Sequence, residues 1–465
     1  MKKIACFCIP AHGHTNPMLP VVSELVKRGD SVRFYSFKEF EEKIRKTGAE
    51  FIPCDRFLPE LSESEEAALK RISTTDMAIQ DIRISIAMND FLEREFEEFR
   101  PDVVFSDSVC FWGKLNAWKF DVPLVVSTST FAFNRTSSQY MKNSPSEIVG
   151  LITGLPRLTK EIKTLEPYGY HIKNPLVLIQ SDNNTDSVVY TSRRFQPYVE
   201  SYSDHYLFVG PSVFSSVVPD KDKKRPLIYI SMGTVINERP DFYGKCFEAL
   251  KDLDADVILS CGNSIRREIL GDIPDNVQVY PYVDQLDVLS KADVFITHCG
   301  MNSVSESLYM ATPMVLYPQT GEQQAVARRA SEIGAGLVLK DDSAAGIRSA
   351  VQQILSDQTY AKAARTCSAD FRSCPGTAGA ADFIENAPHR SETPDPLELL
   401  DKENRKYQLI YWLLALAVAV GTGIFCGIRY IWLVGLVAGV LRGALKNLFD
   451  ARSYSKLVNQ RDGED

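Results

Sequence analysis

The sequence lacks the short motifs that mark the commonest metal and cofactor sites. Its ten cysteines include no C-x-x-C pair, so the spacing typical of a zinc site is missing. Neither G-x-G-x-x-G nor the Walker A pattern occurs, which argues against the ordinary dinucleotide-binding and P-loop proteins. Cys6, Cys8, Cys261 and Cys299 lie in or beside apolar strand-like runs. We expect them to be buried thiols of a reducing compartment.

The sequence also has no excess of basic residues. Its 52 lysines and arginines are outnumbered by 60 aspartates and glutamates, which gives a formal net charge of -8. Because nucleic-acid binding favours a basic face, we expect no nucleic-acid partner. The apolar run near the N-terminus is too short for a secretory signal peptide.

Strand-like and helix-like segments alternate through most of the chain. A length of 465 residues is too great for one compact core, so at least two domains are expected. The alternation predicts an α/β protein whose parallel sheets are covered by helices on both faces. We place one Rossmann-like domain at residues 1–215 and a second at residues 216–385, facing a cleft. Asn16 and Pro17 fit the cap and first residue of the first helix.

The C-terminal part has a different composition. Residues 407–428 carry no charge over 22 positions, which is about the length that crosses the hydrocarbon core of a bilayer. We predict a polar tether over 386–406, a membrane segment over 407–445 as one span or a hairpin, and a polar tail over 446–465. A buried globular helix is the alternative. Basic residues on both flanks favour a membrane-anchored protein with its catalytic domains in the cytoplasm.

One break between a strand and a helix carries a distinctive set of polar residues: His298, Gly300, Asn302 and Ser303. Ligands of such sheets bind beyond the carboxyl ends of the strands, and a helix N-terminus attracts anions. We therefore expect a phosphate group to bind at this break. Ser303 and Glu306 also fit a capping box, so Glu306 either caps the helix or accepts hydrogen bonds from a ribose.

The stretch that begins at His298 reads HCGMNSVSES, then TPMVLYPQTGEQQ. It resembles the nucleotide-sugar signature of family-one glycosyltransferases, H-x-G-x-N-S-x-x-E followed by P-x-x-x-x-P and an acidic residue with Gln. The N-terminal IPAHGHTNPMLP is similar to the start of the bacterial macrolide-glycosyltransferase branch, and YPYVDQL resembles the family's W-x-P-Q-x-x-x-L. The resemblance covers about residues 1–385. It implies the GT-B fold.

The resemblance also implies a catalytic pair in the N-terminal domain. His14 corresponds to the family's general base, which takes the proton of the acceptor hydroxyl. Asp107, after a middle strand, corresponds to the aspartate that orients this imidazole. His12 is a rival base, and a helix cap is the alternative role for Asp107.

For the donor, the resemblance assigns the diphosphate to His298, Gly300, Asn302 and Ser303, and the ribose to Glu306. The resemblance further assigns Glu322 and Gln323 to the sugar hydroxyls and Thr234 to the phosphates. It places Tyr282 and Gln285 beside the nucleobase. Tyr282 replaces the Trp that usually stacks on uracil, so a thymine nucleotide stays open.

The predicted reaction is inverting transfer of a hexose, with glucose expected, from a UDP-sugar to a hydroxyl of an apolar acceptor that is membrane-associated. No metal and no further cofactor are expected, because a helix N-terminus and His298 can stabilise the leaving diphosphate. Two alternatives remain at this point. One is a nucleotide-sugar epimerase of the same fold, and the other is a non-catalytic, membrane-anchored subunit that binds nucleotide sugar.

Overall fold

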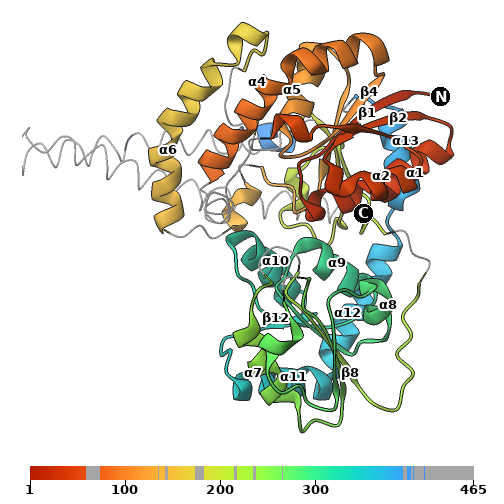
Figure 1. Ribbon diagram of the computed structural model, residues 1–465, viewed down its shortest axis with the longest axis vertical. Helices are drawn as coiled ribbons and strands as arrows, with labels where there is room; N and C mark the ends of the chain where they lie inside the picture. The colour runs from red at the N-terminus through yellow and green to blue at the C-terminus, as the bar shows by residue number, and fades with distance from the viewer. Residues whose placement is uncertain are drawn as a thin grey trace, which may run out of the picture.

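A computed structural model shows two α/β domains stacked end to end (Figure 1). The structure describes residues 1–58, 74–134, 136–141, 145–172, 178, 183–213, 217–233, 237–263, 265–390, 395–399, 402 and 413. In this part of the chain the two sheets are separate, and each is built from parallel strands. The predicted α/β class with two parallel sheets is confirmed.

The N-terminal sheet has seven strands in the order β3-β2-β1-β4-β5-β6-β7. Their bounds are β1 Lys3–Phe7, β2 Ser31–Ser36, β3 Glu50–Pro53, β4 Val103–Asp107, β5 Leu124–Thr128, β6 Asp186–Val189 and β7 Tyr206–Phe208. The central strands β1 and β4 are almost wholly buried, as expected of a parallel sheet with helices on both faces. Asp107 therefore ends a buried strand at the edge where ligands bind.

The helices of this domain are α1 His12–Lys27, α2 Glu41–Lys46, α4 Thr74–Phe99, α5 Phe111–Lys119 and α6 Pro145–Lys163. The predicted start of α1 at Asn16 and Pro17 is wrong. The helix already begins at His12, after Ala11, and Pro17 lies inside it. Consequently His14 projects from the first turn of a helix and not from a loop.

The C-terminal sheet has six strands in the order β10-β9-β8-β11-β12-β13. Their bounds are β8 Leu227–Ser231, β9 Asp256–Ser260, β10 Val277–Tyr280, β11 Val294–Thr297, β12 Met314–Leu316 and β13 Gly336–Val338. The alternation of strands and helices that the sequence predicts is present throughout this half of the chain.

The helices that cover this sheet are α7 Pro240–Leu250, α8 Gln285–Lys291, α9 Met301–Tyr309, α10 Gly321–Glu332, α11 Ala344–Ser356 and α12 Gln358–Arg372. Two apolar clusters fill its two faces. Phe295 and Leu316 point to one cluster, whereas Ile296 and Val315 point to the other. This alternation is the period of two that a strand imposes.

The last helix of the described chain, α13 Gly376–Glu385, returns to the N-terminal domain. It packs on α1, as Figure 1 shows, and its Phe383 and Ile384 join the apolar core of the first sheet. Arg28 of α1 makes ion pairs with Asp382 and Glu385, with 2.6 Å between nitrogen and oxygen in each. The structure differs here from the sequence analysis, which placed this segment in the second domain.

The predicted membrane segment at 407–445 lies outside the described residues, as do most of the predicted tether and all of the predicted tail. Within the described chain, no helix combines the length and the apolar character needed to cross a bilayer.

Replacing Ile384 by Ala tests the packing of α13. Ile384 is fully buried in the N-terminal core, so the change removes apolar contacts and leaves a cavity. We expect a loss of about 2–4 kcal/mol in the free energy of unfolding. Urea denaturation followed by circular dichroism measures it, and the exposed Lys362→Ala on α12 is the control. A loss no larger than that of the control would contradict this packing.

Candidate functional site

The centre of the N-terminal half of the site is a hydrogen bond between His14 and Asp107. His14 Nδ1 lies 2.8 Å from Asp107 Oδ2, and Ser129 Oγ lies 3.1 Å from the same nitrogen. Asp107 is fully buried, and its Oδ1 accepts the backbone N–H of Val109 at 3.0 Å. The carboxylate is therefore fixed, and it favours the tautomer that has its proton on Nδ1. Nε2 is then the nitrogen that can accept a proton.

Two opposing effects set the pKa of His14. Burial disfavours the charged imidazolium and lowers the pKa, whereas the Asp107 carboxylate favours the charged form and raises it. The carboxylate prevails, so the pKa lies above its ordinary value. Glu322 from the second domain and Asp81 also raise it, to a smaller extent.

Asp81 is a residue of this site that the sequence analysis missed. It lies on α4, and burial together with the nearby Asp107 raises its pKa to about 7. Lys114 and His14 act in the opposite direction. A carboxyl group in the middle of an amphipathic helix has no sequence signal, because its proximity to His14 exists only in the fold. Ser129 could have been found, since it directly follows the carboxyl end of β5.

His12, the rival base, has a different partner. Its Nε2 lies 2.8 Å from Glu39 Oε1, and its ring packs edge-on against Phe40. The structure thus brings His14 and not His12 to Asp107. It also shows that Asp107 lies at a strand end and orients a histidine, and is not a helix cap: α5 begins at Phe111, after Cys110.

In the C-terminal half of the site, His298 is held between two glycines. A Cβ atom on either Gly233 or Gly300 would lie 2.5 Å from the imidazole ring, so only glycine leaves room for it. Gly233 also has a φ of 77°, which favours glycine. Burial lowers the pKa of His298 to about 4, although the backbone of Ser231 opposes the shift. A neutral His298 can donate one N–H to a ligand, and its buried Nδ1 makes no hydrogen bond within the described residues.

Helix α9 begins directly after this histidine, and its N-terminus touches the first domain. Asn302 Nδ2 donates to the backbone carbonyl of Gly13 at 3.0 Å. In α1 that carbonyl would ordinarily accept the N–H of residue 17, but Pro17 has none. The amide of Asn302 replaces the missing donor. It thereby joins the helix N-terminus expected to bind phosphate to the residue next to His14.

The capping-box alternative for Glu306 is wrong. Gly300 is the N-cap of α9, and no side chain caps this helix. Glu306 Oε2 instead accepts Gln285 Nε2 at 2.6 Å, and the same amide nitrogen lies 3.4 Å from Ser303 Oγ. Tyr229 donates its hydroxyl to Gln285 Oε1 at 3.2 Å, which fixes the orientation of the amide. Burial raises the pKa of Glu306 to about 7, and Gln285 opposes the shift.

The residues predicted for the sugar and for the nucleobase follow the carboxyl ends of β12 and β10 in the chain. Glu322 and Gln323 occupy the first turn of α10, whose N-cap is Thr320. Tyr282 is 80% exposed, so its ring is open to a ligand. Thr234 lies outside the described residues. Among the residues that the structure describes, no cluster of three or more His, Cys, Asp or Glu side chains is arranged to hold a metal ion.

Comparison with known proteins identifies the family to which the chain is related. Residues 245–386 match the family model described as "Erythromycin biosynthesis protein CIII-like, C-terminal domain". The chain is 34% identical to the NDP-glycosyltransferase YjiC of Bacillus licheniformis over 395 residues, which cover 83% of this chain and 97% of that protein. The chain belongs to family one of the UDP-glycosyltransferases. Its second domain places it with the macrolide-glycosyltransferase-like members.

Two further similarities agree. This glycosyltransferase is 32% identical to the uncharacterised UDP-glucosyltransferase YojK of Bacillus subtilis, over 83% of this chain and 98% of that one. The crystal structure of the kitacinnamycin glycosyltransferase superposes with a TM-score of 0.70 at 26% identity, covering 83% of this chain and 98% of that one. The predicted GT-B fold and transferase activity are confirmed, with a nucleotide sugar as donor. The epimerase and the non-catalytic subunit find no support, because the relatives are named as transferases.

The predicted localisation, a membrane-anchored enzyme, is wrong. No helix in the described ranges can cross a membrane. The relative YojK is covered over 98% of its length by 83% of this chain.

Replacing Asp107 by Asn should lower the pKa of His14. The change removes the charge that raises this pKa and leaves the burial that lowers it. Imidazole protonation should therefore shift to lower pH than in the wild type, and NMR of labelled histidine measures it. Asp186→Asn is a matched control, because Asp186 is buried in the same sheet but pairs with His205. An unchanged His14 titration in Asp107→Asn would show that the carboxylate does not control the pKa of His14.

Proposed function

We propose that this glycosyltransferase transfers glucose from UDP-glucose, with inversion, to a hydroxyl group of an apolar acceptor, and that His14 is the general base. The observation that carries the proposal is the juxtaposition of two halves. The oriented His14–Asp107 pair lies at the end of the first sheet, and the Asn302–Gly13 hydrogen bond brings the N-terminus of α9 beside it.

The chemistry follows from this arrangement. His14 Nε2 takes the proton of the acceptor hydroxyl while the oxygen attacks the anomeric carbon from the face opposite the diphosphate. The bond between that carbon and the diphosphate oxygen breaks, and the diphosphate leaves with the electron pair. Asp107 stabilises the imidazolium that forms. His298 and the backbone N–H groups of α9 donate to the departing diphosphate, so the proposal assigns no metal and no further cofactor.

The donor assignment rests on the side chains around α9 and α10. Glu306, held by Gln285, is proposed to accept the ribose hydroxyls, and Ser303, one turn earlier on α9, is proposed to contact the phosphates. Glu322 and Gln323 are proposed to bind the sugar hydroxyls. The exposed ring of Tyr282 is proposed to stack on uracil.

The acceptor assignment rests on the apolar residues around Asp81 and on the names of the relatives. Ala78 and Ile82 flank Asp81 on α4, and both belong to a buried apolar cluster with Phe111 and Leu158. The family model that matches the second domain is named for erythromycin biosynthesis, and the kitacinnamycin enzyme has the same fold. These features support an apolar acceptor that carries a hydroxyl group.

His14→Ala should abolish transfer but preserve nucleotide binding. Loss of a general base lowers kcat/KM by about 10²–10⁴-fold, whereas the affinity for UDP should change less than about twofold because the base contacts the acceptor. Steady-state kinetics with UDP-glucose in EDTA, and calorimetry with UDP, measure the two quantities. Parallel assays with dTDP-glucose separate uracil from thymine.

His12→Ala is the matched control, since it removes a neighbouring imidazole whose partner is Glu39. It should retain most of the activity. Near-normal turnover of His14→Ala together with an inactive His12→Ala would move the base to His12. Activity with dTDP-glucose but not with UDP-glucose would overturn the assignment of uracil as the nucleobase of the donor.

His298→Ala and Glu306→Ala should each weaken UDP binding by about tenfold. Each change removes a hydrogen bond that involves a charged partner, and such a bond contributes about 1.5 kcal/mol. Ser305→Ala is the control on the same helix, because the Ser305 hydroxyl is buried and makes no hydrogen bond within the described chain. If calorimetry gives the same UDP affinity for all three variants, the assignment of His298 and Glu306 to the donor site is wrong.

A further inference from the structure

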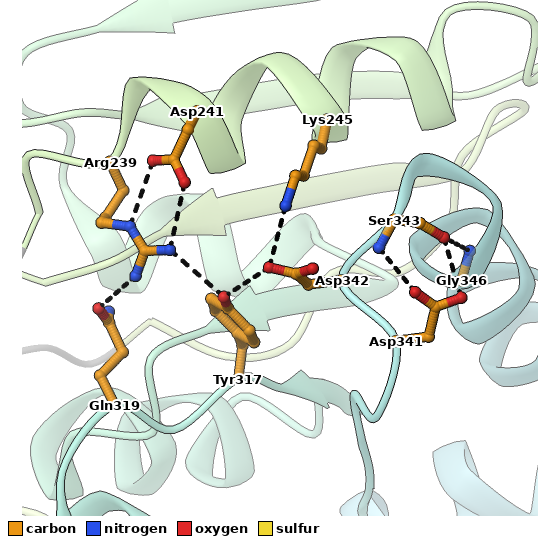
Figure 2. A network of polar contacts seen from close by, with 9 residues as sticks. All are labelled: Arg239, Asp241, Lys245, Tyr317, Gln319, Asp341, Asp342, Ser343 and Gly346. Atoms are coloured by element: carbon orange, nitrogen blue, oxygen red, sulfur yellow. Dashed lines mark hydrogen bonds and ion pairs between the residues drawn. The ribbon is translucent and has the colours of Figure 1, made fainter.

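A polar network surrounds the loop that leads from β12 into α10 (Figure 2). The loop comprises residues 317–320, and it connects the carboxyl end of β12 to the helix that carries Glu322 and Gln323. Arg239, the residue before α7, reaches this loop from the neighbouring part of the domain. The family signature includes the residues of α10 but gives Arg239 no role.

The guanidinium of Arg239 binds three side chains. Its Nη1 donates to Gln319 Oε1 at 2.8 Å, and its Nη2 lies 3.3 Å from Tyr317 Oη. Its Nε lies 3.3 Å from Asp241 Oδ1, so the charge is paired. A planar guanidinium can hold these partners in fixed relative positions, which a single ammonium group cannot do.

Gln319 in turn binds the side chain of Gln323. The backbone N–H of Gln319 donates to Gln323 Oε1 at 2.8 Å, and the backbone N–H of Gln323 donates to Thr320 Oγ1 at 3.3 Å. The amide oxygen of Gln323 is thus directed into the loop. The NH₂ group of the same amide points in another direction than this oxygen, so it can donate to a different acceptor.

The other side of the network holds Tyr317 in place. Its hydroxyl donates to Asp342 Oδ2 at 2.9 Å, and Lys245 Nζ lies 3.1 Å from the same oxygen. Its ring stacks on Phe242 with 4.3 Å between the centroids. Tyr317 is therefore fixed by α7 and by the segment before α11, and Arg239 binds to a rigid support.

We propose that Arg239 is a positioning residue for recognition of the donor sugar: through Gln319 it holds the side-chain amide of Gln323 with its NH₂ group turned toward the sugar hydroxyls. The inference rests on the proposed function, in which Gln323 binds the sugar. It adds that a residue about eighty positions earlier in the chain controls this contact. The nucleoside and diphosphate, held at α9 and Tyr282, do not depend on it.

The test compares the dissociation constants of UDP and UDP-glucose, because their ratio isolates the contribution of the sugar. Arg239→Met and Gln319→Leu break the same contact from its two sides. Each should weaken UDP-glucose binding by about three- to tenfold, the contribution of one hydrogen bond, and leave UDP binding within about twofold. Isothermal titration calorimetry on the full chain gives both constants.

Arg225→Met is the matched control. Arg225 belongs to the same domain and pairs with Asp254 and Asp256, but it does not reach the loop. It should leave both constants unchanged even where its melting temperature falls as far as that of Arg239→Met. A purely structural role for Arg239 would weaken UDP and UDP-glucose binding by the same factor, which would overturn the inference.

Gln323→Ala separates this inference from the proposed function. It should weaken UDP-glucose binding as Arg239→Met does, and the double variant Arg239→Met/Gln323→Ala should be no weaker than Gln323→Ala alone, because both changes remove one contact. If Gln323→Ala leaves the ratio of the UDP and UDP-glucose dissociation constants unchanged, the assignment of Gln323 to the sugar is wrong. If Gln323→Ala weakens UDP-glucose binding relative to UDP binding but Arg239→Met and Gln319→Leu do not, only the positioning role of Arg239 is wrong.

Discussion

The two halves of the site depend on a hydrogen bond that a proline makes possible. Pro17 cannot donate to the Gly13 carbonyl, and Asn302, which lies 289 residues further along the chain, donates to it instead. Gly13 is exposed, and its carbonyl, left without the helical N–H partner, accepts this donor from α9 instead. In each sheet, the residues expected to bind ligand follow the carboxyl ends of parallel strands. The bond between α1 and α9 links these two edges, and the hydrogen bond of Tyr140 with Glu332 is a further contact between the two domains.

Local patterns explain how much could be predicted. The alternation of strands and helices and the break at His298 were predictable, because these signals span only a few residues each. The pairing of His14 with Asp107 came from the resemblance, and the structure brings the two side chains together at 2.8 Å. Their roles in catalysis stay predictions.

What sequence reasoning missed depends on contacts between distant segments. Asp81 looks like any polar residue on an amphipathic helix until α4 packs on α5 and its carboxyl group comes under the influence of Asp107. Arg239 looks like a charged residue before a helix, and its contact with Gln319 exists only in the folded domain. The start of α1 was misplaced because Asn16 and Pro17 have the chemistry of a helix start, while the carbonyl left without a donor by Pro17 is satisfied from the other domain.

The return of α13 to the first sheet has a consequence for hybrid enzymes that combine acceptor and donor specificities from different relatives. The first domain is discontinuous: it consists of the N-terminal stretch plus Gly376–Glu385, whose Phe383 and Ile384 complete its core. A hybrid joined once, before β8, would pair α1 with a foreign α13, and the ion pairs of Arg28 with Asp382 and Glu385 would form only if the foreign helix carried the same acidic residues. Exchange of the donor domain therefore needs two junctions, one before β8 and one between α12 and α13.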